Sequence, residues 1–169
     1  AEVRERGRLR LSSEAMDFFA GDGRSGVAAS DRIRGIVLHE ILSQVKTFAD
    51  LHDAVMSSMQ AGNISADEAG EVETLLSLRI RQAEDYGWVR EGARILNETA
   101  LIDTDGEVYR PDRVVISDGK VEIIDYKFGE HHDKYLRQLR KYSEIWTGIG
   151  CPDVSAYLWY VKSGEIVHV

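Results

Sequence analysis

The spacing of apolar residues along the chain changes once, from a helical period to a strand period. Between residues 31 and about 46, apolar residues recur every three or four positions, which predicts an amphipathic helix with one buried stripe. A second helix is predicted near residues 51–59. A third begins at Ser65, where the spacing to Glu68 matches a capping box, and ends at Gly87. This half of the chain is therefore expected to be helical.

From residue 93 onward the pattern is typical of strands. The turn sequences Asp105-Gly106 and Asp118-Gly119 separate three β-rich runs, residues 94–102, 108–116 and 121–128, which predicts an antiparallel three-strand meander. A helix over residues 133–146 follows, and then a strand pair over residues 154–161 and 165–169 that turns at Ser163-Gly164. The predicted fold class is α/β, with a central mixed β-sheet flanked by helices.

The N-terminal region differs from the rest in composition. Residues 4–10 are mostly charged and indicate a tether, Ser12 or Ser13 could cap a short helix through Phe19, and the glycines of residues 21–30 indicate a loop. We therefore expect a tether and short helix over residues 1–30 and a single domain over residues 31–169. Because the chain begins with Ala1, we expect it to be an excised piece of a longer protein.

Composition narrows the classes of function. No apolar run approaches the roughly 18 residues that span a bilayer, which predicts a soluble, cytoplasmic protein with no membrane partner. A single cysteine, Cys151, rules out an internal disulfide and a metal cluster held by several thiolates. The net charge of −8 disfavours a nucleic-acid binder that acts alone. Either another domain shares such binding, or the charge only maintains solubility.

The candidate chemistry lies around the Asp118-Gly119 turn. A two-residue hairpin there would place Asp112 directly opposite Asp125, where two carboxylates repel unless a proton or a cation lies between them. Lys127 lies two residues beyond Asp125, so strand alternation returns it to the same face. The sequence therefore predicts a divalent metal between the two aspartates, with an amine beside it.

Five motifs follow one another along the chain: Gly35-x-x-x-His39 in the first long predicted helix, Glu98 in the first predicted strand, Pro111-Asp112, Asp125-Tyr126-Lys127, and Gln138-x-x-x-Tyr142 in the following predicted helix. In this order and on these elements, they resemble the PD-(D/E)xK nuclease superfamily, and within it the RecB-like exonuclease domains at the C-terminus of helicase–nuclease proteins such as the AddA and RecB subunits. The resemblance covers roughly residues 35–142.

The resemblance implies a restriction-endonuclease-like fold and a metal-dependent deoxyribonuclease. By position, His39, Asp112, Asp125 and the backbone carbonyl of Tyr126 would bind Mg²⁺ or Mn²⁺, and Lys127 would stabilise charge on the phosphate and hold the attacking water. Gln138 and Tyr142 would contact the phosphate of the substrate. Glu98 is a possible further site residue. A strict two-residue turn at Asp105-Gly106 would pair it with Arg113 and point it away from Asp112, whereas a three-residue loop would reverse that orientation.

The resemblance also implies partners. DNA, as single-stranded ends, would come from an ATP-dependent helicase, expected on the same full-length polypeptide and acting in double-strand break repair and recombination. The chain has no Gly-x-x-x-x-Gly-Lys-Ser/Thr phosphate loop, so the ATP site would lie elsewhere. With one cysteine it would belong to the branch without an iron–sulfur cluster.

Each candidate residue also has a structural interpretation. His39 could be a core histidine, a register slip would separate Asp112 from Asp125, Lys127 could be solvated, and Tyr142 could pack in an apolar stripe. His131 and His132 are expected to be exposed to solvent. Four basic residues of the last predicted helix form either an edge that faces DNA or an ordinary polar face: Lys134, Arg137, Arg140 and Lys141. For the whole protein, the alternatives are a non-catalytic nuclease-fold module that binds DNA or a partner, and a hydrolase of small molecules.

Overall fold

The structure is a computed structural model that describes residues 26–169, apart from the side chains of residues 26–30, 32 and 33. The predicted tether and short N-terminal helix lie largely in residues 1–25, outside the described residues. The helices are α2 (Gly26–Ser43), α3 (Leu51–Gln60), α4 (Ala66–Asp85) and α5 (Asp133–Gly148), with a short 3₁₀ helix η1 (Phe48–Asp50). None of these described helices has the length and apolar character needed to cross a membrane.

Five strands form the main sheet: β1 (Arg94–Asn97), β4 (Arg113–Ser117), β5 (Lys120–Lys127), β6 (Asp153–Tyr160) and β7 (Glu165–His168). Their order is β1-β4-β5-β6-β7, and only β5 and β6 run parallel. The predicted α/β class with a mixed sheet is therefore confirmed. The change from antiparallel to parallel follows from the connections, because a hairpin joins β4 to β5 whereas helix α5 carries the chain from β5 to β6.

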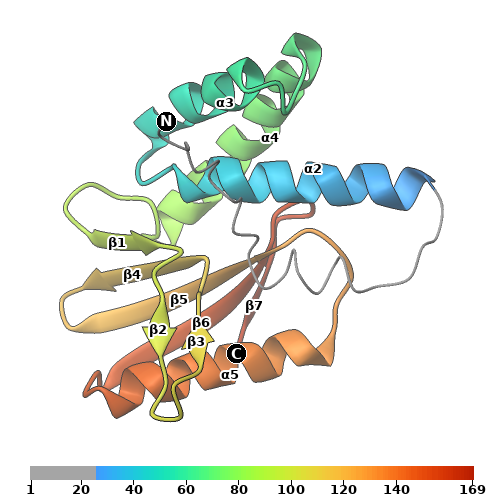
Figure 1. Ribbon diagram of the computed structural model, residues 1–169. Helices are drawn as coiled ribbons and strands as arrows, with labels where there is room; N and C mark the ends of the chain where they lie inside the picture. The colour runs from blue at the N-terminus through green and yellow to red at the C-terminus, as the bar shows by residue number, and fades with distance from the viewer. Residues whose placement is uncertain (1–25) are drawn as a thin grey trace, which may run out of the picture.

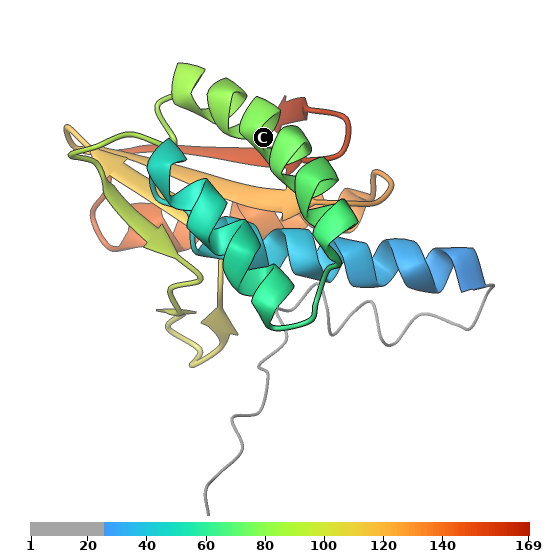
Figure 2. The same ribbon diagram turned by 90° about the horizontal axis from the view of Figure 1, so that it is seen from above.

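Helices cover both faces of the sheet (Figures 1 and 2). Helices α2, α3 and α4 pack on one face and share a core with Val115, Ile124 and Trp159. Helix α5 packs on the other face, against Val121 and Ile123 among others. Strand β5 is thus buried on both sides, and its side chains alternate between the two cores.

The predicted three-strand meander is wrong in its first connection. The run 94–102 is divided into β1 and β2 (Leu101–Ile102), and the run 108–116 into β3 (Val108–Tyr109) and β4. Strands β2 and β3 pair only with each other, in a separate two-stranded sheet. The runs break where Glu98 adopts a positive φ of 50° and where Pro111 lacks an N–H to donate to a ladder.

Two local predictions of the sequence are confirmed. Asp118 and Gly119 both have positive φ, 51° and 79°, as a type I′ turn requires. The Ser65 side chain accepts from the Glu68 N–H while the Glu68 carboxylate accepts from the Ser65 N–H, so α4 begins with a capping box.

The loop predicted to continue to Ser30 is wrong from Gly26 onward, because α2 already includes Ala28 and Ala29, which favour a helix.

Candidate active site

The start of β4 and the end of β5 bring two aspartates together at one end of the sheet. The β4–β5 register pairs Ser117 with Lys120 and Arg113 with Ile124, and one further step along it places Asp112 opposite Asp125. The Asp112 N–H donates to Asp125 Oδ1 at 3.3 Å, and the Tyr126 N–H donates to Asp112 Oδ2 at 2.6 Å. Both residues are buried, with exposures of 5% for Asp112 and 3% for Asp125. The two carboxylates therefore face one small buried region from neighbouring strands.

Lys127 extends the cluster along β5. Alternation places it on the same face of the strand as Asp125, and its Nζ lies 3.0 Å from Asp125 Oδ2. The side chain is 2% exposed, so the amine does not point into bulk water. A buried ammonium is retained only where charges or dipoles compensate for its lost hydration. Asp125 supplies one such compensation.

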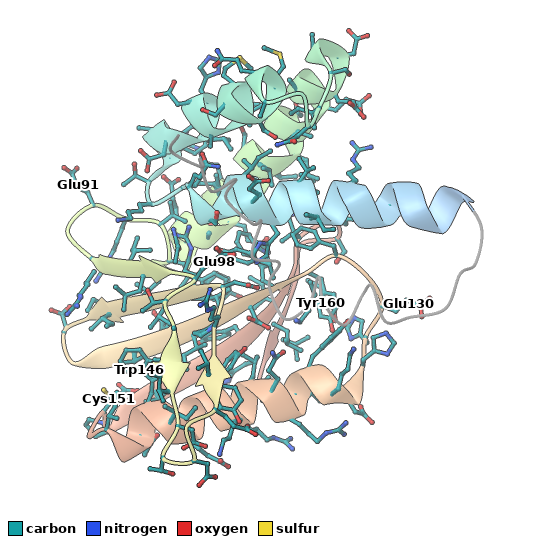
Figure 3. The ribbon with its side chains drawn as sticks, in the orientation of Figure 1. Glu91, Glu98, Glu130, Trp146, Cys151 and Tyr160 are labelled. Atoms are coloured by element: carbon teal, nitrogen blue, oxygen red, sulfur yellow. The ribbon has the colours of Figure 1, made fainter. Side chains whose placement is uncertain are left out.

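His39 reaches the aspartates from α2. Its Nε2 lies 2.5 Å from Asp112 Oδ1, and its Nδ1 lies 3.4 Å from Glu98 Oε1. Glu98 follows the end of β1, close to α2 (Figure 3). The structure has the three-residue loop and not the two-residue turn: the Asp103 N–H donates to the Glu107 carbonyl, so residues 104–106 form the loop. Asn97 therefore pairs with Arg113, and the Glu98 N–H donates to the Asp112 carbonyl.

Gly35 explains how α2 approaches the sheet closely enough for His39 to reach. A side-chain carbon at Gly35 would lie 3.2 Å from Phe128 Cβ, which is tighter than ordinary contact. Phe128 directly follows Lys127, the last residue of β5, and His39 lies one helical turn after Gly35. The glycine of Gly35-x-x-x-His39 therefore permits close packing of the helix beside the candidate site.

The pKa values of Asp112 and Asp125 are shifted in opposite directions. Burial and the adjacent charge of Asp112 raise the pKa of Asp125 to about 6. Burial acts on Asp112 in the same direction, but His39, Lys127 and the Tyr126 N–H outweigh it and hold the pKa of Asp112 below its ordinary value. At neutral pH two negative charges thus lie side by side in a buried region, and a cation between them would lower their repulsion.

Helix α5 contributes Gln138 and Tyr142 to the same region. Gln138 Nε2 donates to the Tyr142 hydroxyl at 2.9 Å, one helical turn away. Burial, followed by the charges of Asp125 and Asp112, raises the pKa of the Tyr142 phenol. Tyr142 is only 1% exposed and belongs to the core under α5, so its ring packs in that core while the charges of both aspartates act on its hydroxyl. The structural and functional interpretations of Tyr142 are compatible.

The donor set suits a hard divalent cation in type but is not arranged as a finished metal site. Within residues 26–169, no group of three or more His, Cys, Asp or Glu side chains is placed to hold a metal ion. The His39 ring contacts the Asp112 carboxylate, and the Lys127 ammonium contacts the Asp125 carboxylate. The candidate ligand atoms are therefore directed at one another and not at a common point. Carboxylate oxygens and an imidazole are nevertheless the ligands that Mg²⁺ and Mn²⁺ accept. His39, Asp112, Asp125 and the Tyr126 carbonyl stay the predicted ligands.

Sequence reasoning missed Arg113, which lies directly beside Asp112 and is 2% exposed. Its guanidinium donates to the Trp88 carbonyl at 2.9 Å, the Leu42 carbonyl at 3.3 Å and the Tyr126 hydroxyl at 2.7 Å, and also to the Val45 carbonyl. It thereby joins the end of α2, the segment after α4, and β5. A signal was present, because an arginine in the run Arg-Val-Val-Ile must be buried if the strand is covered on both faces.

The remaining candidates are two histidines in the loop before α5 and four basic residues on α5 itself. His131 and His132 are exposed, as expected, although His131 stacks on Tyr160 and its Nε2 lies 3.0 Å from Glu165 Oε2. Of the basic residues on α5, Lys134, Arg137 and Arg140 are exposed, whereas Lys141 lies 2.6 Å from Asp103 of the β2–β3 hairpin. The structure therefore leaves three cationic side chains of α5 exposed to solvent.

A scan of the sequence against protein-family models found no match, and a search of curated proteins found none either.

Proposed function

We propose that the protein is a metal-dependent DNA exonuclease domain that hydrolyses phosphodiester bonds, with a restriction-endonuclease-like fold of the PD-(D/E)xK type. The observation that carries this proposal is the cluster of two buried aspartates from neighbouring strands, one of which, Asp125, contacts the buried Lys127 on the same face. Such a cluster costs stability in a protein that does not use it, because charges are removed from water. The mixed sheet between two helical layers supports the fold assignment.

Each residue has a role in this proposal. His39, Asp112, Asp125 and the Tyr126 carbonyl would hold Mg²⁺ or Mn²⁺, which when bound activates water and neutralises charge on the scissile phosphate. Lys127 places its ammonium 3.0 Å from Asp125, where it can stabilise the phosphate oxygens and orient the attacking water. Gln138 and Tyr142 would donate hydrogen bonds to the substrate phosphate. The exposed cations of α5 would attract the DNA backbone.

The proposal includes a partner. The motifs that resemble RecB-like domains support a place as the C-terminal part of an ATP-dependent helicase–nuclease in double-strand break repair, with single-stranded DNA ends as substrate. The net charge of −8 supports shared DNA binding, since the exposed cations of α5 are few.

The test is degradation of end-labelled single- and double-stranded DNA with Mg²⁺, with Mn²⁺ and with EDTA. We expect metal-dependent degradation by the native protein, and a loss of at least about 100-fold in Asp112→Asn and Lys127→Met because each variant removes charge stabilisation at the phosphate. Thermal unfolding should show that both variants are folded. Matched controls are Asp105→Asn and Lys162→Met, which change exposed residues elsewhere and should keep native activity. Native rates in Asp112→Asn or Lys127→Met would contradict the mechanism.

A second candidate is a non-catalytic module that keeps the nuclease fold to bind DNA or a partner. One observation favours it: no ready metal site of three or more acidic, histidine or cysteine side chains occurs among the described residues. Titration calorimetry with Mn²⁺ separates the candidates. Binding that is lost in Asp125→Asn supports the enzyme, and no binding by the native protein supports the module.

A further inference from the structure

The first turn of α5 places an aromatic ring against the candidate catalytic lysine. Tyr135 is half-buried, and its ring centroid lies 4.1 Å from Lys127 Nζ. The edge of His132 meets the same ring, with centroids 5.4 Å apart and planes at 82°. The ammonium of Lys127 thus contacts the Asp125 carboxylate on one side and the face of Tyr135 on another.

The two contacts differ in a way that matters for a phosphate substrate. An aromatic face attracts a cation through its quadrupole but carries no net charge. A second carboxylate in the same place would hold the ammonium more strongly, but it would also repel an incoming phosphate and compete with it for the amine. A ring fixes the position of the ammonium and leaves its charge available.

We propose that Tyr135 is a positioning residue for Lys127: its ring holds the ammonium at the place where the transferring phosphate would develop charge. This inference rests on the proposed nuclease function, because it requires a phosphate at the site. It adds a residue outside the motifs on which that function was argued, since Tyr135 belongs to neither Asp125-Tyr126-Lys127 nor Gln138-x-x-x-Tyr142.

The test compares Tyr135→Leu with Tyr135→Phe in steady-state DNA degradation with Mn²⁺. Leucine removes the aromatic face but keeps an apolar side chain, whereas phenylalanine keeps the face and loses only the hydroxyl. We expect Tyr135→Leu to lower kcat by roughly 5- to 30-fold, the factor that corresponds to one cation–π contact of a desolvated amine. We expect KM and the calorimetric Kd for Mn²⁺ to change less than about twofold, and Tyr135→Phe to restore kcat to within about twofold of native.

A merely structural role would give a different pattern. It would lower the unfolding midpoint and would alter KM or metal affinity together with kcat. Tyr86→Leu is the matched control, because Tyr86 is 46% exposed at the end of α4 and should keep native kcat. An unchanged kcat in Tyr135→Leu, or an equal loss in Tyr135→Phe, would overturn the role of the ring. A native protein without metal-dependent activity would overturn the proposed function itself, and this inference with it, before any variant is compared.

Discussion

Glu98 is the residue whose backbone and side chain are both unusual. Its φ of 50° is a left-handed conformation that costs free energy for a residue with a side chain, and its carboxylate lies 3.4 Å from His39 Nδ1. A carboxylate at one ring nitrogen fixes the tautomer and orientation of a histidine, and leaves the other nitrogen as a metal ligand. The geometry is thus suited to present Nε2 of His39 toward Asp112 and a bound cation.

We therefore predict that Glu98→Ala weakens Mn²⁺ binding by about 10-fold or more, the usual effect of losing such an outer partner. Titration calorimetry of folded protein is the measurement. Glu91→Ala is the control, because Glu91 is exposed in the segment before β1 and should bind Mn²⁺ as the native protein does. Equal affinities in Glu98→Ala and Glu91→Ala would show that Glu98 does not orient His39.

The positions of single side chains could be predicted where the local backbone constrains them. The relation of Asp112, Asp125 and Lys127 followed from the turn, since positive φ at two consecutive residues fixes the register of a hairpin. The orientation of Glu98 depended on the length of the loop at Asp105-Gly106, which the sequence left open, because a two-residue turn and a three-residue loop place Glu98 on opposite faces. The burial of Arg113 was hidden because a charged residue type ordinarily indicates surface.

Arg113 links three elements around the site. Its donors reach carbonyls at the end of α2 and after α4, together with the hydroxyl of Tyr126 on β5. Carbonyls at the C-terminal end of α2 carry the negative end of the helix dipole, which compensates the buried guanidinium. The bonds hold the helix that carries His39 against the strands that carry the two aspartates.

We predict that Arg113→Met lowers the free energy of unfolding by roughly 3 kcal/mol or more, because several buried acceptors lose their donor at once. Urea denaturation measures this loss. Arg110→Met provides the control, since Arg110 is exposed on the same segment and its substitution should change stability by less than about 0.5 kcal/mol. A loss of similar size in both variants would mean that the bonds of Arg113 add nothing.

Helices and strands were predicted correctly where several local sequence signals agree. Helix α4 could be recognised because its capping box and its apolar period agree, and β5 because a β-rich run begins directly after a tight turn. The start of α2 was misjudged because glycines before and at Gly26 indicate a loop, whereas packing of the following turns decides the helix. The division of the predicted meander depended on one strained residue and one proline, which an apolar pattern does not register.

For the molecule as a whole, charge placement matters more than net charge. The chain carries −8 overall, yet its buried charges are concentrated where β4 begins and β5 ends, and three cations are exposed on the adjacent α5. In the proposed nuclease these cations would attract a phosphate backbone, and a bound divalent cation would offset the carboxylates. Folding, metal binding and substrate binding would then be coupled through the same few groups.

This coupling gives the free energy of unfolding a specific dependence on pH. In metal-free protein the pKa of Asp125 is raised to about 6, above its ordinary value, so the folded state binds its proton more tightly than the unfolded state does. The contribution of Asp125 to stability is fully present below about pH 4 and is lost as the pH rises through 6. Asp125→Asn cannot ionise at this position and lacks the change.

We therefore predict that the stability of native protein relative to Asp125→Asn, measured by urea denaturation in EDTA, falls by roughly 2–3 kcal/mol between pH 4 and pH 7. Saturating Mn²⁺ at pH 7 should restore stability to the native protein and not to Asp125→Asn, because a cation that binds only the folded state stabilises it by mass action. A relative stability that is constant or rises with pH in EDTA would show that burial and the charge of Asp112 do not raise the pKa of Asp125. A Mn²⁺ effect of equal size in both proteins would place the cation elsewhere.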